Sequence, residues 1–186
     1  MRQDWQLTIP WNIWVFKTIN LNRHRILDVF YLNYFRLGKG YSSPVYVLFF
    51  AYFGGLKQIF CFFPGAIICA VMVRRLKWHF QHKRPGKLLK DVHNMEGFRS
   101  KSFPSGDAAY VFFILTSSLY TLGPIPILCL LLNAILISYG RIYMGAHFPI
   151  DVVFGALLGV FSGIIGIFLW VWLLEQYFYL ISNLLL

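Results

Sequence analysis

The chain has 186 residues, of which 58% are hydrophobic and only 13% are charged. This composition excludes an ordinary soluble domain, in which charged residues make up about a quarter of the chain. The apolar residues form long unbroken runs, so we predict an all-α integral membrane protein with residues 1–186 as a single domain. The net charge of +10 comes from bases in the short polar gaps between those runs, which indicates lipid head groups or a phosphate site rather than nucleic acid.

The N-terminal part of the chain contains one short apolar segment and one amphipathic segment. The first residues lead into no clean apolar core followed by a small-residue cleavage site, so no cleavable signal peptide is predicted. Residues 9–19 are apolar but short for a membrane span. Over residues 22–39, basic side chains alternate with apolar ones, which predicts a helix lying in the membrane interface.

Two strongly apolar segments follow, over residues 44–56 and 59–73. Because so few residues separate them, we expect a hairpin of two spans. The polar stretch 74–102 comes next and is the longest region without an apolar run. Its many basic residues make it the first place to look for an anion site.

Three further spans are predicted in the C-terminal half. Residues 108–122 and 127–138 flank a Gly-Pro-Ile-Pro turn, and residues 152–174 are numerous enough to cross a bilayer with some tilt. In the last span, glycines recur every fourth residue at Gly155, Gly159 and Gly163, which indicates close packing against a neighbouring helix.

Counting the short first segment, the prediction is six transmembrane helices with an amphipathic interfacial helix near the N-terminus. An even number of spans places both termini on one side of the membrane. The polar stretch 74–102 and the segment 140–151 then share the opposite side.

The first group of candidate functional residues lies in the polar stretch. Lys77 is followed, after six intervening residues, by Arg84 and Pro85. Both bases would attract an anion, but taken alone a Lys and an Arg in a membrane protein's loop indicate only ordinary interfacial charges.

The second group, Pro104 to Asp107, stands directly before an apolar run. Ser105 is a good N-cap residue, and Gly106 leaves room for a ligand to approach the backbone at a helix start. Simple helix capping explains the same pair of residues equally well.

The third group is the segment from Gly140 to Asp151. A proline suits the first position of a helix, so Pro149 predicts a helix start with Asp151 in its first turn and His147 just before it. A carboxylate behind an imidazole fixes its tautomer and makes the His a useful nucleophile or base, and Arg141 could clamp a phosphate. The alternative is a capped helix end with an Arg extending to the membrane surface.

Taken in order, the three groups resemble the motifs of the type 2 phosphatidic acid phosphatase superfamily, membrane lipid phosphatases related to acid phosphatases and vanadium haloperoxidases. That family's pattern is Lys, six residues, Arg-Pro; then Pro-Ser-Gly-His; then Ser-Arg, five residues, His, three residues, Asp. This sequence matches the pattern at Lys77, Arg84, Pro85, Pro104, Ser105, Gly106, Arg141, His147 and Asp151.

The resemblance implies a mechanism. His147, oriented by Asp151, would attack phosphorus and form a phosphohistidine, and no metal or other cofactor would be needed. In the family, the His that ends the middle motif protonates the leaving group. The phosphate oxygens would be held by Lys77, Arg84, Ser105, Gly106 and Arg141.

Two positions depart from the family pattern. Gly140 stands where the family has Ser, which removes one hydroxyl. Asp107 stands at the catalytic position of the proton-donating His, and an Asp beside several cations should be ionised near neutral pH, hence a poor acid. Three histidines of the polar stretch are conceivable substitutes, although they are also explained as interfacial polar residues: His79, His82 and His93.

The resemblance implies a small bacterial-type phosphatase whose partners are a lipid phosphate and membrane lipids. Without a good acid, the enzyme should favour substrates whose leaving group needs little protonation. We therefore expect lipid A 1-phosphate as substrate, with undecaprenyl diphosphate or phosphatidylglycerophosphate as alternatives.

Two other classes of protein stay open. A catalytically silent lipid-phosphate binder would keep the cationic pocket but not the acid. A transporter is disfavoured because the spans are nearly free of charged residues at mid-depth.

The expected location is the bacterial inner membrane. Most bases near span ends fall on the motif side, so the positive-inside rule would make that side cytoplasmic. The family resemblance favours the periplasmic face instead. We adopt the periplasmic assignment because many of these bases have a phosphate-binding reason to be there.

Overall fold

The computed structural model describes residues 5–95 and 101–184, and every regular element within them is helical, as predicted. Residues 96–100 of the predicted polar stretch lie outside the described residues. The elements are η1 (Trp5–Thr8), α1 (Pro10–Leu21), α2 (Arg25–Tyr34), η2 (Phe35–Gly38), η3 (Gly40–Ser42), α3 (Ser43–Phe53), α4 (Gly55–Phe80), α5 (Pro85–Leu88), α6 (Gly106–Ser118), α7 (Pro124–Tyr143) and α8 (Pro149–Leu184).

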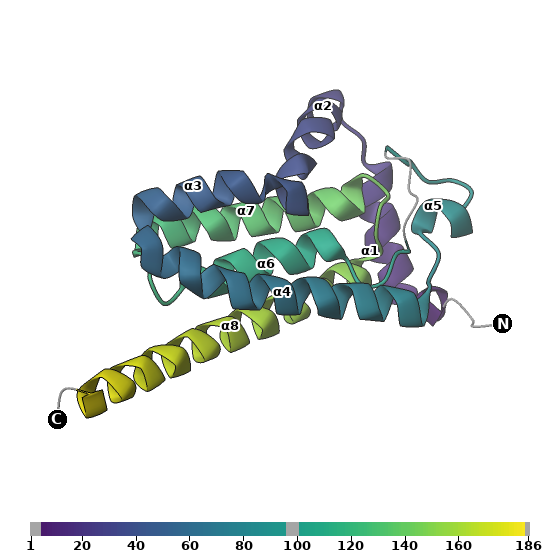
Figure 1. The fold of residues 1–186 in the computed structure, drawn as a ribbon. Helices are drawn as coiled ribbons and strands as arrows, with labels where there is room; N and C mark the ends of the chain where they lie inside the picture. Colours follow the sequence, from purple (N-terminus) through teal and green to yellow (C-terminus); the bar gives the residue numbers. More distant parts are fainter. Residues whose placement is uncertain (1–4, 96–100, 185–186) are drawn as a thin grey trace.

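Five of these helices form a bundle, and α1 lies across one end of it. Helices α3, α4, α6 and α7 run alongside one another, and α8 packs against α6 and α4 (Figure 1). The predicted hairpin is present as the helices α3 and α4, which meet at Gly54 and Gly55, but α3 is not among the segments long enough to be a span. Gly55 has a φ of 62°, a left-handed conformation that suits glycine.

The glycine stripe of α8 lets this helix approach α6 closely, as predicted. A Cβ atom on Gly155 would stand 2.3 Å from the carbonyl oxygen of Ser105, and one on Gly159 would stand 2.2 Å from that of Ala109. The contact aligns the starts of the two helices, so that the Ser105 N–H donates to the carbonyl of Asp151 at 2.9 Å. The second and third motif groups are thereby brought together.

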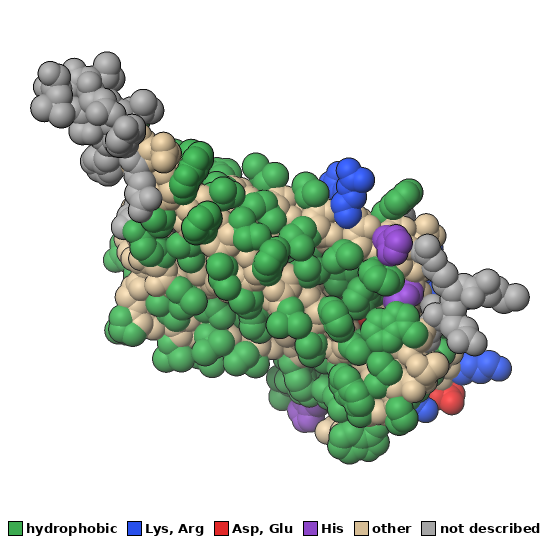
Figure 2. All heavy atoms as spheres, turned by 90° about the horizontal axis from the view of Figure 1, so that it is seen from below, with side chains coloured by type: hydrophobic (Ala, Val, Ile, Leu, Met, Phe, Trp, Pro, Cys, Tyr) green, Lys and Arg blue, Asp and Glu red, His purple; other side chains and the backbone are tan. Residues whose placement is uncertain are grey.

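The predicted count of six transmembrane helices is not confirmed. In the described part of the chain, three segments are long and apolar enough to cross a membrane: Gln58–Leu88, Pro124–Tyr143 and Pro149–Leu174. Helices α1, α3 and α6 have 12, 11 and 13 residues, fewer than the roughly 20 that a full span needs. Hydrophobic side chains cover most of the face in Figure 2, and charged side chains gather toward the end where α1 lies.

The expectation that both termini share one side is wrong. Trp5 packs against His82 and Phe103, at the end of the bundle that carries the motifs, whereas α8 carries the chain to the opposite end (Figure 1). The reason is that α1 does not span. Its buried Asn12 and Asn20 bond to backbone groups at that end: Asn12 accepts from the N–H of Ile150 at 3.0 Å, and Asn20 donates to the carbonyl of Tyr143 at 2.8 Å.

One predicted boundary shifts, and one residue of the predicted surface helix is buried; both findings matter for the site. Helix α4 continues past residue 73 to Phe80, so Lys77 lies on a helix rather than in the polar loop. It ends at Gln81, which adopts the left-handed conformation. The amphipathic segment is helical as expected, but one of its residues, Tyr31, is buried against α7.

Candidate active site

His147 and Asp151 form a buried pair at the junction of α7 and α8. Helix α8 begins at Pro149, as predicted, which places Asp151 in its first turn. Nδ1 of His147 lies 3.6 Å from Oδ2 of Asp151, and both side chains are almost fully buried. The Asp151 carboxylate also accepts the N–H of Phe148 at 3.0 Å, which fixes it against the helix start. The carboxylate therefore stands behind the imidazole, with Nδ1 as the nitrogen that faces it.

Two residues that the sequence did not identify complete the surroundings of Asp151. The amide of Gln6 donates to Oδ1, and the hydroxyl of Ser102 donates to Oδ2. Gln6 is fully buried, and the side-chain amide of Asn12 donates to the backbone carbonyl of Gln6 at 2.9 Å. With the N–H of Phe148, the carboxylate thus has three donors, which fix its position behind the imidazole. No motif marks Gln6, because its partner is 145 residues away along the chain.

The first motif group brings two cations to the site, and one of them lies beside Nε2 of the imidazole. Nη1 of Arg84 lies 3.3 Å from Nε2 of His147 and donates to the carbonyl of Ala146 at 2.9 Å. Lys77, near the end of α4, donates to the carbonyl of Lys101 at 2.9 Å. The segment that follows α4 and the α7–α8 loop are therefore joined at the site.

The pKa of His147 is lowered well below its usual value of 6.5. Burial is the largest cause, because it disfavours the charged imidazolium, and four cations add to it: Arg84, Lys77, Arg141 and Lys39. The imidazole is therefore neutral at neutral pH. A guanidinium can only donate, so the approach of Arg84 to Nε2 assigns the lone pair to this nitrogen and the proton to Nδ1, which faces Asp151. A neutral imidazole with its lone pair on Nε2 is suited to attack on a phosphorus atom.

Asp107 is paired with two cations. Its Oδ2 lies 2.9 Å from Nε of the buried Arg141 and 3.1 Å from Nζ of Lys39. Lys39 lies in the short segment between η2 and η3, and sequence reasoning did not assign it to the site. Asp107 lies in the first turn of α6, after Gly106. Ser105 caps this helix as predicted, and its hydroxyl accepts from the N–H of Ala108 at 3.4 Å.

Gly140, the other departure from the family motif, is explained by Tyr31 of α2. A Cβ atom at position 140 would stand 2.5 Å from Cδ1 and 2.6 Å from Cε1 of the Tyr31 ring. Tyr31 is buried, and its ring also packs against that of Tyr143 with the centroids 5.2 Å apart. A serine at position 140 would have to displace this ring.

The three histidines considered as substitute acids do not join His147. His79 and His93 are exposed, and the backbone N–H of His93 donates to the side chain of Asn20. His82 is buried, but its ring packs among aromatic side chains, namely Trp5, Phe80 and Phe103.

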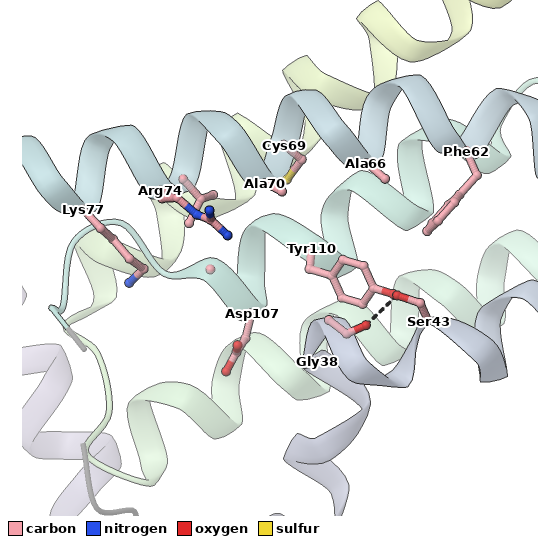
Figure 3. Close-up of a pocket in the computed structure, with 13 residues that line it drawn as sticks. Gly38, Ser43, Phe62, Ala66, Cys69, Ala70, Arg74, Lys77, Asp107 and Tyr110 are labelled. Carbon is pink, nitrogen blue, oxygen red and sulfur yellow. Dashed lines mark hydrogen bonds between the residues drawn. The ribbon is translucent and has the colours of Figure 1, made fainter. Parts of the chain in front are cut away.

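A cavity of about 540 Å³ adjoins these residues (Figure 3). Lys77, Gly106 and Asp107 form part of its wall, and most of the rest is apolar, contributed by α4, α6 and the start of α3. The hydroxyls of Ser43 and Tyr110 form a hydrogen bond of 2.8 Å on this wall. A cationic pocket beside an apolar cavity suits an amphiphile with a phosphate head. Within residues 5–95 and 101–184, no group of His, Cys, Asp and Glu side chains is arranged to hold a metal ion.

Two solved structures of membrane proteins resemble this chain. The crystal structure of LpxE from Aquifex aeolicus matches with a TM-score of 0.78 and 38% sequence identity, over 84% of this chain and 94% of that chain. A phosphatidylglycerolphosphate phosphatase of the PAP2 type from Bacillus subtilis matches with a TM-score of 0.67 over 90% of this chain and 86% of that chain. Its identity is 21%, so this second match supports the fold alone.

Comparison of sequences identifies the family. An undecaprenyl-diphosphatase of Sulfolobus acidocaldarius is 29% identical over 160 residues, which are 81% of this chain and 74% of that protein. Residues 55–179, about two thirds of the chain, match the PAP2 superfamily. The resemblance seen in the three motif groups is thereby confirmed: the chain belongs to the PAP2 superfamily, and it is a phosphatase of membrane lipid phosphates.

Proposed function

We propose that this protein removes the 1-phosphate of lipid A through a phosphohistidine intermediate. The observation that carries the mechanism is the position of His147 between Asp151, which faces Nδ1, and Arg84, which lies 3.3 Å from Nε2. The choice of substrate is supported by LpxE, a lipid A 1-phosphatase, which is 38% identical over 94% of its chain.

In the proposed first step, Nε2 of His147 bonds to phosphorus and the bond from phosphorus to the bridging oxygen breaks. The electron pair stays on that oxygen, which leaves with the sugar. Developing charge on the phosphoryl oxygens is stabilised by the surrounding cations and by donors at the start of α6: Lys77, Arg84, Arg141, the Ser105 hydroxyl and the Gly106 N–H. Water then breaks the bond between nitrogen and phosphorus and releases inorganic phosphate.

The pairing of Asp107 with Arg141 and Lys39 supports a leaving group that needs little protonation. The Asp107 oxygen that faces both cations is engaged in ion pairs with them, so this side chain serves as an anchor for cations and not as a proton donor. The anomeric oxygen of lipid A leaves as a hemiacetal oxyanion, which is less basic than the alkoxide from phosphatidic acid. The leaving group of the proposed substrate thus suits a site that has no proton donor at position 107.

We place the site at the periplasmic face of the bacterial inner membrane. The acyl part of the substrate would occupy the apolar cavity, with its phosphate beside Lys77. Support for this side comes only from the likeness to lipid A and undecaprenyl phosphatases, whereas the positive-inside rule favours the cytoplasmic side. Labelling of single cysteines introduced between residues 86 and 94 by a membrane-impermeant reagent, added from each side, decides between them.

Two alternatives have specific support. Undecaprenyl diphosphate is the substrate named for the relative from Sulfolobus acidocaldarius. A silent lipid-phosphate binder is suggested by the substitution at Asp107.

The test is phosphate release by the purified protein from lipid A 1-phosphate, lipid A 4′-phosphate, undecaprenyl diphosphate and phosphatidic acid, each with and without a chelator. We expect release from the 1-phosphate that vanadate inhibits and a chelator does not. Turnover of phosphatidic acid alone would contradict the substrate, no turnover at all would favour the silent binder, and loss of activity with chelator would contradict the metal-independent mechanism.

A further inference from the structure

Arg74 adds a second cation to the cavity beside the proposed phosphate site. It lies on α4 one helical turn before Lys77, and both residues line the cavity. Figure 3 shows the two side chains leaving the same face of α4, with the guanidinium of Arg74 pointing into the cavity. Arg74 belongs to none of the three motif groups.

Unlike the motif cations, Arg74 has no protein partner in the part of the chain that the structure describes. Arg141 is paired with Asp107, Arg84 bonds to the carbonyl of Ala146, and Lys77 bonds to that of Lys101. The guanidinium of Arg74 makes no hydrogen bond or ion pair with residues 5–95 or 101–184. An unpaired guanidinium beside a cavity is available for an anion that enters it.

The cavity wall along α4 changes from charged to apolar in one direction. Lys77 comes first, and Arg74 follows three residues away, about 4.5 Å along the helix axis. Beyond it the helix contributes Ala70, Ala66 and Phe62. This order matches an amphiphile with two adjacent negative groups followed by hydrocarbon, and the two phosphates of a diphosphate ester share one bridging oxygen.

We propose that Arg74 forms a second anion subsite, which binds the lipid-linked phosphate of a lipid diphosphate while the terminal phosphate lies against His147. The inference rests on the proposed function, because it takes the phosphate site at His147 as given. It assigns a binding residue to the diphosphate esters of lipid alcohols, the class to which the alternative substrate undecaprenyl diphosphate belongs.

Cleavage of a diphosphate at this subsite needs no acid. Nε2 of His147 bonds to the terminal phosphorus, and the bond from that phosphorus to the bridging oxygen breaks. The electron pair stays on the bridging oxygen, so the leaving lipid monophosphate gains negative charge beside Arg74. Water then hydrolyses the phosphohistidine. Arg74 stabilises the leaving group by charge, so that this step needs no proton donor.

The test is a binding measurement on the full chain in a zwitterionic detergent, with His147→Ala introduced to prevent turnover. Farnesyl diphosphate and farnesyl phosphate serve as ligands, because they share one hydrocarbon and differ by one phosphate. In this background we expect Arg74→Gln to weaken binding of the diphosphate by about tenfold, as for one charge-assisted hydrogen bond, and binding of the monophosphate by less than about twofold.

The matched control is Arg75→Gln, which removes the neighbouring exposed arginine that does not line the cavity. We expect it to leave both affinities within about twofold. The subsite is overturned if Arg74→Gln weakens both ligands equally or neither, if Arg75→Gln has the same effect, or if the protein binds neither ligand. The proposed function is tested separately by phosphate release from lipid A 1-phosphate by the wild type, and its failure leaves this binding result unchanged.

Discussion

Oδ2 of Asp107 lies 2.9 Å from Nε of Arg141, and the same oxygen lies 3.1 Å from Nζ of Lys39. The carboxylate therefore lies on the Nε side of the buried guanidinium. A residue at the position of the family's proton donor thus holds two cations in place. We infer that Asp107 orients Arg141 toward the phosphate and does not protonate the leaving group.

This inference predicts how Asp107→His changes substrate preference. Loss of the ion pairs to Arg141 and Lys39 should affect every substrate alike, whereas a restored acid helps only substrates with basic leaving groups. We expect the ratio of kcat/KM for phosphatidic acid to that for lipid A 1-phosphate to rise by about tenfold or more. The measurement is phosphate release from both lipids by both proteins, and an unchanged ratio would show that position 107 does not govern proton donation.

A second prediction concerns Gly140 and Tyr31. A serine at position 140 would bring its Cβ within 2.5 Å of the Tyr31 ring, and such overpacking of a buried contact costs about 1–3 kcal/mol. We expect Gly140→Ser to lower the temperature of thermal unfolding in detergent, and Tyr31→Ala in the same chain to remove that clash. Gly123→Ser is the control, because a Cβ at position 123 meets nothing within 4 Å. Equal stability of the two serine variants would refute the packing argument.

A third prediction concerns Gln6, the distant residue that donates to Asp151. Loss of a hydrogen bond to a charged group costs about 1.5–3 kcal/mol, so Gln6→Ala should lower kcat by about tenfold or more with little change in KM. Thr8→Ala is the control on the same segment, because the Thr8 hydroxyl bonds to the nearby carbonyl of Trp5 at 2.7 Å. A Gln6 variant with the kcat of the wild type would show that Asp151 needs no support from the N-terminal segment.

A fourth prediction follows from the lowered pKa of His147, which lies between the predicted spans. A lowered pKa keeps the imidazole neutral at pH 6.5, so the acidic limb of the kcat/KM profile should fall below this pH. In the same way, the contribution of His147 to stability should be present above pH 6.5 and be lost as the pH falls. Arg84→Met removes the largest cationic cause and should raise the pKa. NMR titration of His147 in the wild type and in Arg84→Met measures both pKa values. A pKa at or above 6.5 in the wild type would contradict the prediction.

The local part of the site could be predicted because short-range rules determine it. Pro149 starts a helix, so His147 and Asp151 had to lie within a few residues of that start, and Ser105 had to cap α6. The glycine stripe of α8 predicted the close approach to α6. These rules act over three or four residues, which is the range that one sequence displays.

The part of the site that joins distant segments could not be predicted. Gln6 and Lys39 reach the site only because α1 crosses the end of the bundle and η2 packs near the start of α6. Asn12 and Asn20 hold α1 there through backbone groups more than a hundred residues away. As an apolar segment of 12 residues, α1 also resembled a marginal span, which led to the wrong placement of the termini.

The most direct test of the account is chemical trapping of the phosphohistidine. Wild-type protein is mixed briefly with lipid A carrying a radiolabelled 1-phosphate and quenched in alkali, in which phosphohistidine survives and phosphoserine does not. We predict label on the peptide that contains His147, a label that disappears on acid treatment, and no label in His147→Ala. Turnover by the wild type without labelled protein, or label that persists in His147→Ala, would contradict a mechanism through this histidine.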